Sequence, residues 1–140
     1  MPTHGVSVRY LKERFADHLE ENVYTLCAEV VTATAASKTS FAVQLLGEDA
    51  LKRHVKPVAD VFVSYAWAFN LGDVIGASES QGLGEANIWM DVFLVNQHEV
   101  PGLGKEVDAW LSTFGGAVKK VVFVLSPWSK LVNAVRAWCV

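Results

Sequence analysis

The sequence predicts an α/β domain with a parallel sheet. Three apolar runs lie after residue 60, at residues 61–65, 88–95 and 121–125. They are rich in β-branched and aromatic residues without strict alternation, which is typical of strands that helices cover on both faces. Each run leads into a segment whose apolar residues have helical spacing, and polar or tryptophan residues stand at the downstream end of each run. Ligands of such sheets bind beyond the carboxyl ends of the strands, so the residues that follow each run are the functional candidates.

Composition excludes several classes of protein. The chain has 140 residues, of which 51% are hydrophobic, and this suffices for one domain with a buried core. The net charge of -3 and the lack of a Lys/Arg run argue against a nucleic-acid partner. No signal peptide is evident, and no apolar run approaches the roughly 18 residues of a membrane span. We therefore expect a cytoplasmic protein without a membrane partner.

An N-terminal helical extension is predicted over residues 1–58. Ser7 can cap a long amphipathic helix that reaches about residue 31, with apolar positions three or four residues apart. This helix either packs on its own domain, the favoured alternative, or offers a seam to a partner helix. Short helices are expected at residues 41–46, before Gly47, and at 48–55, before Pro57.

The predicted domain proper covers residues 59–140. The first strand leads into a helix at residues 67–75, which Gly72 and Gly76 weaken by roughly 1 kcal/mol each relative to alanine. A loop at 78–87 precedes the second strand, and a helix at 107–118 precedes the third. A last helical pattern reaches Val140 without a stop signal. We expect either a shortened α/β domain or one that the N-terminal helices and a partner chain complete, since open sheet edges invite association.

Candidate ligand-binding residues follow the first and third strands. In a 2-1-3 strand order these strands are neighbours, and two tryptophans, a tyrosine and two hydroxyls then surround one crevice. Such a site suits a flat aromatic ligand, for example a base or nicotinamide. The alternative, which is the commoner case, is that the tryptophans only plug the ends of the sheet. The residues are Ser64, Tyr65, Ala66, Trp67, Ser126 and Trp128.

The second strand contributes Asp91 and the polar residues that follow it. A carboxylate inside an apolar strand needs a partner, which backbone amides or Arg136 could supply, and this structural role is slightly favoured over a catalytic one. Asn96 and Gln97 bring amides to the same rim. His98 alone is weak evidence for a base.

Cysteine and glycine motifs assign no chemistry. Cys27 and Cys139 lie on apolar helix faces without metal-ligand spacing, so both are expected to be buried thiols and no metal site is expected. A reactive Cys139 is the less favoured alternative. Gly82 and Gly84 precede a strand, which excludes a Rossmann fingerprint and a P-loop. No catalytic residue is assigned on these patterns.

Three blocks together resemble a known family. Asp60-Val-Phe-Val-Ser64-Tyr65-Ala66-Trp67 resembles the opening strand of TIR (Toll/interleukin-1 receptor) domains. Trp89-Met-Asp91-Val-Phe-Leu-Val95-Asn96-Gln97-His98, and Leu125-Ser126-Pro127-Trp128 with Arg136-Ala-Trp138-Cys139, follow in order. Together they are similar to a TIR-like group in algae and other protists. The resemblance covers roughly residues 60–140.

The resemblance implies a flavodoxin-like fold and one of two activities. TIR domains are self-associating signalling scaffolds, or enzymes that cleave NAD at the nicotinamide bond. In the enzymes a glutamate a few residues after the Trp-Cys pair stabilises the ribosyl cation. Here Trp138-Cys139 is present, but no acidic residue follows Ser126, and the family's last two strands are missing. The TIR-like domain is therefore expected to be incomplete at its C-terminus.

Three hypotheses follow. The first is a TIR-like signalling module that associates with itself or with other TIR-like domains and keeps a nucleotide-sized cleft. The second is an NAD hydrolase whose carboxylate lies beyond Val140 or comes from Asp91 or another subunit. The third is an unrelated α/β domain with a structural role. No cofactor is expected, with NAD only as a substrate.

Overall fold

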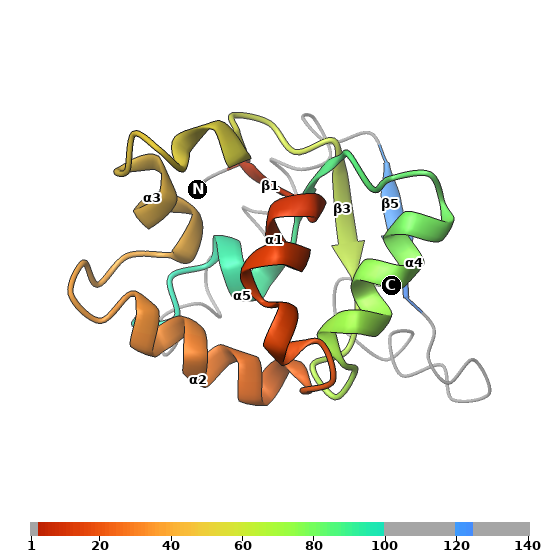
Figure 1. Cartoon of the computed structure of the whole chain (residues 1–140), viewed down its shortest axis with the longest axis horizontal. Coiled ribbons are helices and arrows are strands. Elements are labelled where there is room, and N and C mark those ends of the chain that lie inside the picture. The colour runs from red at the N-terminus through yellow and green to blue at the C-terminus, as the bar shows by residue number, and fades with distance from the viewer. Residues whose placement is uncertain (1–2, 100–119, 125–140) are drawn as a thin grey trace.

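The structure is a computed structural model that describes residues 3–99 and 120–124. It has a five-stranded mixed sheet in the order β2-β1-β4-β3-β5 (Figure 1). The strands are β1 (Gly5–Ser7), β2 (Val55–Lys56), β3 (Val61–Ser64), β4 (Asn87–Trp89) and β5 (Val121–Phe123). The α-helices are α1 (Val8–Arg14), α2 (Val23–Ala33), α3 (Phe41–Leu46), α4 (Leu71–Ser80) and α5 (Asp91–Leu94). The predicted α/β class is confirmed.

The three apolar runs contribute β3, β4 and β5. β3 lies between the other two and is parallel to both, with Phe62 opposite Trp89 and Ser64 opposite Phe123. This is the 2-1-3 order expected for the three predicted strands. All four β3 residues are buried, as a central strand requires. The predicted helix at residues 107–118 and the last helical pattern, which reaches Val140, lie outside the described residues.

The N-terminal part adds strands that the sequence did not predict. β1 is antiparallel to both β2 and β4, so the sheet is mixed and not purely parallel. Strands of three and two residues are too short to give a period-two signal, which explains why they were missed. β1 also covers the outer edge of β4. The predicted helical extension thus contains part of the sheet.

The prediction of one long N-terminal helix was wrong. Ser7 caps α1 as expected, since its Oγ accepts a hydrogen bond from the Tyr10 N–H at 3.3 Å. α1 ends at Arg14, a 3-10 turn covers Ala16–His18, and Asn22 then caps α2 through a 3.0 Å bond from the Thr25 N–H. Apolar spacing of three and four continues across this break, whereas the N-cap preference of asparagine marks it.

The second apolar run is only partly a strand, which corrects the prediction for residues 88–95. β4 ends at Trp89, and Asp91 begins the short helix α5. Val92, Phe93 and Leu94 are fully or almost fully buried in that helix. A short apolar run without alternation fits a buried helix as well as a buried strand. Asp91 itself is half-buried at the first helical position, where a carboxylate is favourable.

The predictions of the shorter helices were partly confirmed. α3 is confirmed with its predicted bounds, and Gly47 ends it. The predicted helix at 48–55 was wrong, because the segment forms only a 3-10 turn at Lys52–His54 before β2. α4 includes both glycines and extends to Ser80, so the loop before β4 is shorter than predicted.

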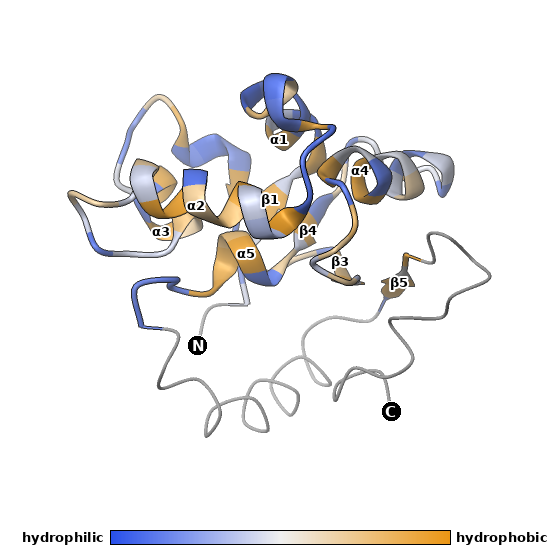
Figure 2. Cartoon of the chain, turned by 90° about the horizontal axis from the view of Figure 1, so that it is seen from below, coloured by the Kyte–Doolittle hydropathy of each residue, from blue (hydrophilic) through white to orange (hydrophobic). Residues whose placement is uncertain are grey.

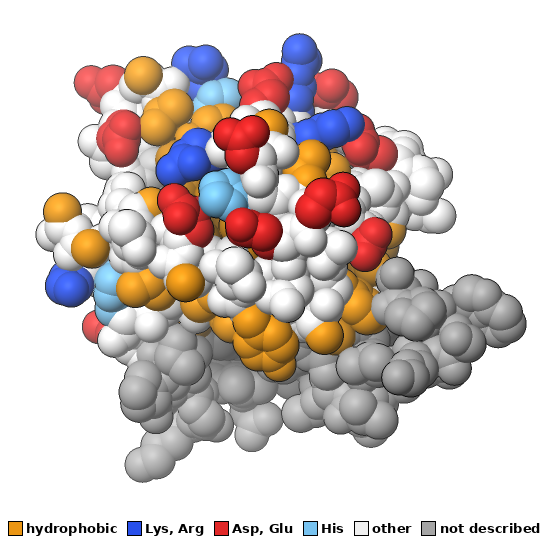
Figure 3. Space-filling view, turned by 60° about the horizontal axis from the view of Figure 1, so that its bottom comes forward, with side chains coloured by type: hydrophobic (Ala, Val, Ile, Leu, Met, Phe, Trp, Pro, Cys, Tyr) orange, Lys and Arg blue, Asp and Glu red, His pale blue; other side chains and the backbone are white. Residues whose placement is uncertain are grey.

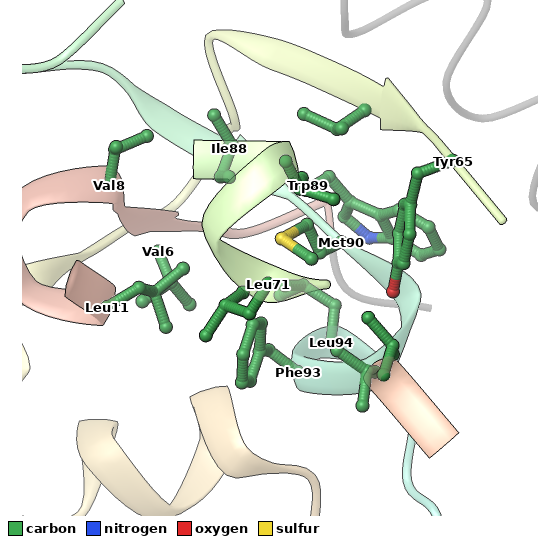
Figure 4. Close-up of a cluster of buried hydrophobic side chains, with 14 of the residues drawn as sticks. Val6, Val8, Leu11, Tyr65, Leu71, Ile88, Trp89, Met90, Phe93 and Leu94 are labelled. Carbon is green, nitrogen blue, oxygen red and sulfur yellow. The ribbon is translucent and has the colours of Figure 1, made fainter. Parts of the chain in front are cut away.

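The core lies between the sheet and the helices. α1 and α4 contact each other and lie on the same side of the sheet (Figure 2). The rings of Phe15, Phe41 and Phe93 lie 5.4 to 5.5 Å apart, centroid to centroid, and join α3 and α5 to the end of α1. Nearer the sheet, Val6, Leu11 and Ile88 are fully buried in the same core (Figure 4).

The outer surface carries charges of both signs. Figure 3 shows acidic and basic side chains interspersed over one face, with hydrophobic side chains gathered lower in the view. Lys12 of α1 pairs with Glu79 of α4 at 3.0 Å, and Arg9 pairs with Glu85 at 3.8 Å. These exposed pairs add little stability each. None of the helices among the described residues is long and apolar enough to cross a membrane.

Candidate functional site

The site lies at the carboxyl ends of β3 and β4. Because the two strands are parallel and adjacent, the residues after β3 meet the residue that begins α5 after β4. Tyr65 and Trp67 come from the first segment and Asp91 from the second. We call this group of three side chains the rim cluster.

Hydrogen bonds hold the rim cluster together. The Tyr65 hydroxyl donates to Oδ1 of Asp91 at 2.5 Å, and the Trp67 indole N–H donates to both carboxylate oxygens at 3.1 Å. Tyr65 is only 1% exposed, and its hydroxyl is directed toward α5 (Figure 4). Bonds to a charged acceptor are stronger than neutral ones, so they fix both aromatic rings around the carboxylate.

Helix α2 forms a second wall of the site. Tyr24 lies edge-on to Trp67, with ring centroids 5.6 Å apart and an interplanar angle of 66°. The Val23 N–H donates to the carbonyl oxygens of Trp67 and Phe69 at 3.0 and 3.1 Å, which fixes the start of α2 against the loop after β3. The break between α1 and α2 therefore places α2 at the rim.

Gln97 links the backbone of Asp91 to Cys27 of α2. The Gln97 amide donates to the backbone oxygens of Asp91 and Val95 at 3.2 Å each, and its oxygen accepts from the Cys27 thiol at 3.7 Å. Burial, and then the negative charge of Asp91, raise the pKa of the Cys27 thiol. Cys27 is therefore a neutral thiol at neutral pH, and it is half-buried, whereas the sequence predicted a buried thiol.

The other predicted site residues have different positions. Ser64 and Ala66 are buried, with exposures of 1% and 5%. Asn96 binds away from the rim cluster, where its amide donates to the Lys38 carbonyl at 2.9 Å, and Nε2 of His98 lies 2.9 Å from the Thr34 hydroxyl. Ser126 and Trp128, like Arg136 and Cys139, lie outside the described residues.

The sequence found part of the site and missed another part. It placed Tyr65 and Trp67 at the rim and named Asp91 as a ligand-binding candidate, but it expected Asp91 within a strand, with backbone amides or Arg136 as partners. It missed Tyr24 and Cys27, which belong to α2. The signal that could have found them is Asn22, because an N-cap there separates α2 from α1 and frees it to reach the rim.

Two further features of the described part are relevant to ligands. Within residues 3–99 and 120–124, no group of three or more His, Cys, Asp or Glu side chains could hold a metal ion. A hollow of about 270 Å³ lies between the end of α4 and the start of β5. The β5 residues that line it pair with Phe62 and Val63 of β3, so the hollow is separate from the rim cluster. It is lined by Ala77, Ser80, Gln81, Lys120, Val121 and Val122.

The rim cluster is a fixed carboxylate bounded by aromatic rings. Such a group can stabilise positive charge on a bound molecule or orient a hydrogen-bond donor. Comparison of the chain with family models, with curated proteins and with solved structures gave no match.

Proposed function

We propose that the protein is a TIR-like signalling domain that acts by self-association and keeps a nucleotide-sized ligand site at the rim. The support is that the sequence blocks that resemble TIR domains coincide with the strands that have the strand order of a flavodoxin-like sheet. The blocks that resemble TIR domains begin on β3 and β4, and the third block starts next to β5. These strands are parallel in the 2-1-3 order that a flavodoxin-like sheet requires.

The observation that carries self-association is the arrangement of the two sheet edges. At one edge β2 carries Lys56 and is followed by Pro57, two features that discourage pairing. At the other edge β5 pairs only with β3 within the described part of the chain, and Val121 is 50% exposed. An apolar strand edge is a ready template for a second copy of the chain. We therefore assign the contact to the β5 edge.

Sedimentation velocity over a range of protein concentrations tests this proposal. The wild-type chain is expected to shift from monomer to a larger species as the concentration rises. Val121→Lys is expected to remain monomeric, because it places a charge on the contact. Val58→Lys is the matched control, since Val58 is 41% exposed beside β2, and it should associate like the wild type. A folded wild-type chain that stays monomeric throughout would contradict self-association.

NAD hydrolysis is the second candidate function, and the rim cluster favours it. In the enzymes that the chain resembles, the bond between ribose and nicotinamide breaks, and its electron pair leaves with nicotinamide. A carboxylate stabilises the ribosyl cation, water adds to that cation, and a proton is released. Asp91, held by Tyr65 and Trp67, is a carboxylate that could face such a cation.

Nicotinamide release, followed by chromatography, tests the second candidate. We expect turnover by the wild-type chain and a loss of about a hundredfold or more in Asp91→Asn, because a charge that stabilises a developing cation is removed. Asp73→Asn is the control, since Asp73 is exposed on α4. Equal turnover in both variants would exclude Asp91 from catalysis, and no turnover in a folded wild-type sample would exclude the enzyme.

A further inference from the structure

We infer that α2 supplies Tyr24 to a binding corner for planar aromatic cations, formed by the Tyr24 ring and by the Trp67 ring, whose indole N–H donates to Asp91. The inference rests on the proposed ligand site at the rim and names a residue and a ligand class for it. Tyr24 belongs to residues 1–58, outside the stretch that resembles TIR domains. Tyr24 is therefore a site residue that the resemblance does not imply.

Accessibility is the first support. Tyr24 is 65% exposed, the highest value among the large exposed hydrophobic side chains of the described residues, and Trp67 is half-buried. Their rings meet at 66° with centroids 5.6 Å apart. Two rings at such an angle form an inside corner, where a flat ligand can stack on one ring while its edge contacts the other. An exposed tyrosine in this position presents ring surface to the solvent.

Rigidity is the second support. The Val23 N–H bonds to the carbonyl oxygens of Trp67 and Phe69 fix the backbone of one wall against that of the other. The two bonds from the Trp67 indole to the Asp91 carboxylate fix the second ring. Because the Trp67 ring and the backbone next to Tyr24 are held before a ligand arrives, binding requires less ordering of the site.

The negative charge of Asp91 is the third support, because it favours a cation as the ligand. An indole N–H that donates to a carboxylate shifts electron density into the ring, which strengthens the attraction of the ring face for a cation. The negative charge of Asp91 also reaches the neighbouring side chains, because it contributes to the raised pKa of Cys27. A flat ring with a positive charge therefore fits the corner better than its neutral counterpart.

Binding of two closely matched ligands tests the inference on the full chain. The probes are 1-methylnicotinamide, which is a planar cation, and nicotinamide, which is neutral and nearly the same shape. Calorimetric titration or ligand-observed NMR would measure both affinities. The wild-type chain is expected to bind the cation more tightly than the neutral ring. Tyr24→Ala should weaken binding of the cation by about twofold to fivefold, the range for an exposed cation–π contact.

Two variants separate a ligand contact from a general effect on the fold. Tyr24→Phe keeps the ring and should bind the cation within about twofold of the wild type, since the ring face makes the contact. Val43→Ala removes another exposed apolar side chain, 42% exposed on α3, and should not change binding. Equal affinity for the two ligands, or an unchanged affinity in Tyr24→Ala, would overturn the inference.

Failure of this inference and failure of the proposed function give different results. A chain that sediments as an associating species through Val121 but binds neither ligand would retain the proposed self-association and overturn the binding corner. A monomeric chain that binds the cation through Tyr24 would contradict the proposed self-association and support the binding corner. The two measurements share no variant.

Discussion

The hydroxyl oxygen of Tyr65 lies 2.5 Å from Oδ1 of Asp91, although the two residues are 26 positions apart in the sequence. This bond connects the end of β3 to the start of α5. It therefore links the segments that follow two neighbouring parallel strands, past the last residues that pair in the sheet. Both residues follow buried strands, and the contact is therefore part of the fold as well as of the candidate site.

Tyr65→Phe is expected to lower the free energy of unfolding by about 1–3 kcal/mol, because the variant removes a hydrogen-bond donor to a charged group and keeps the buried ring. Chemical denaturation with fluorescence detection measures the change. Tyr10→Phe is the control, because the Tyr10 ring stacks on His54 at 4.2 Å and that contact does not need the hydroxyl. Equal midpoints for wild type and Tyr65→Phe would show that the bond contributes nothing to stability.

Gly72 and Gly76, one turn apart in α4, should respond to alanine with opposite signs. A Cβ at Gly72 would lie 2.9 Å from the Leu19 carbonyl oxygen, which also accepts the Gly72 N–H at 2.8 Å, whereas nothing lies within 4 Å of a Cβ at Gly76. Gly72→Ala must therefore separate α4 from the turn between α1 and α2, and we expect it to destabilise the chain. Gly76→Ala should stabilise it by up to about 1 kcal/mol through helix propensity.

Thermal unfolding of the two glycine variants beside the wild type checks this pair. The melting temperature is expected to fall for Gly72→Ala and to rise for Gly76→Ala. A rise in both would mean that the turn at Leu19 moves away from α4 at little cost, and that helix propensity alone decides both positions.

The sequence predicted those parts of the fold whose signals are local and long enough. The four-residue strand β3, the bounds of α3 and the cap at Ser7 follow from apolar runs, Gly47 and a hydroxyl before a helix. The short strands β1 and β2 could not be predicted, because long-range pairing with β4 and with each other defines them. Tyr24 was missed for the same reason, since only the packing of α2 on the loop after β3 brings it to Trp67.

Asn22→Ala tests the break that brings α2 to the rim. Asn22 caps α2 through its side-chain oxygen, and loss of such a cap costs about 0.5–2 kcal/mol. Asn70 holds the same position before α4, but its side chain makes no capping bond, so Asn70→Ala should cost less. Denaturant midpoints of the two variants measure the difference. A larger loss in Asn70→Ala would contradict the assignment of the cap.

Asp60 should make part of the stability depend on acid pH. Its carboxylate accepts the Asn87 N–H at 2.9 Å and the Lys56 ammonium at 2.6 Å, so it joins the start of β3 to β4 and β2. The Asn87 bond first, and the Lys56 bond next, lower the pKa of Asp60 in the folded chain, against a smaller opposing effect of burial. In the unfolded chain the pKa of aspartate is about 4.

The sign of the pH effect follows from these two states. Since the unfolded chain takes up the proton first, the contribution of Asp60 is fully present above about pH 4 and is lost as the pH falls through the lower pKa of the folded chain. Asp60→Asn is therefore expected to be less stable than the wild type at pH 7, with a gap that narrows toward pH 3. Asp49→Asn, at a carboxylate that is 99% exposed, should differ little from the wild type at either pH. Urea unfolding at the two pH values measures both gaps, and a gap for Asp60→Asn that widens in acid would reverse the assigned shift.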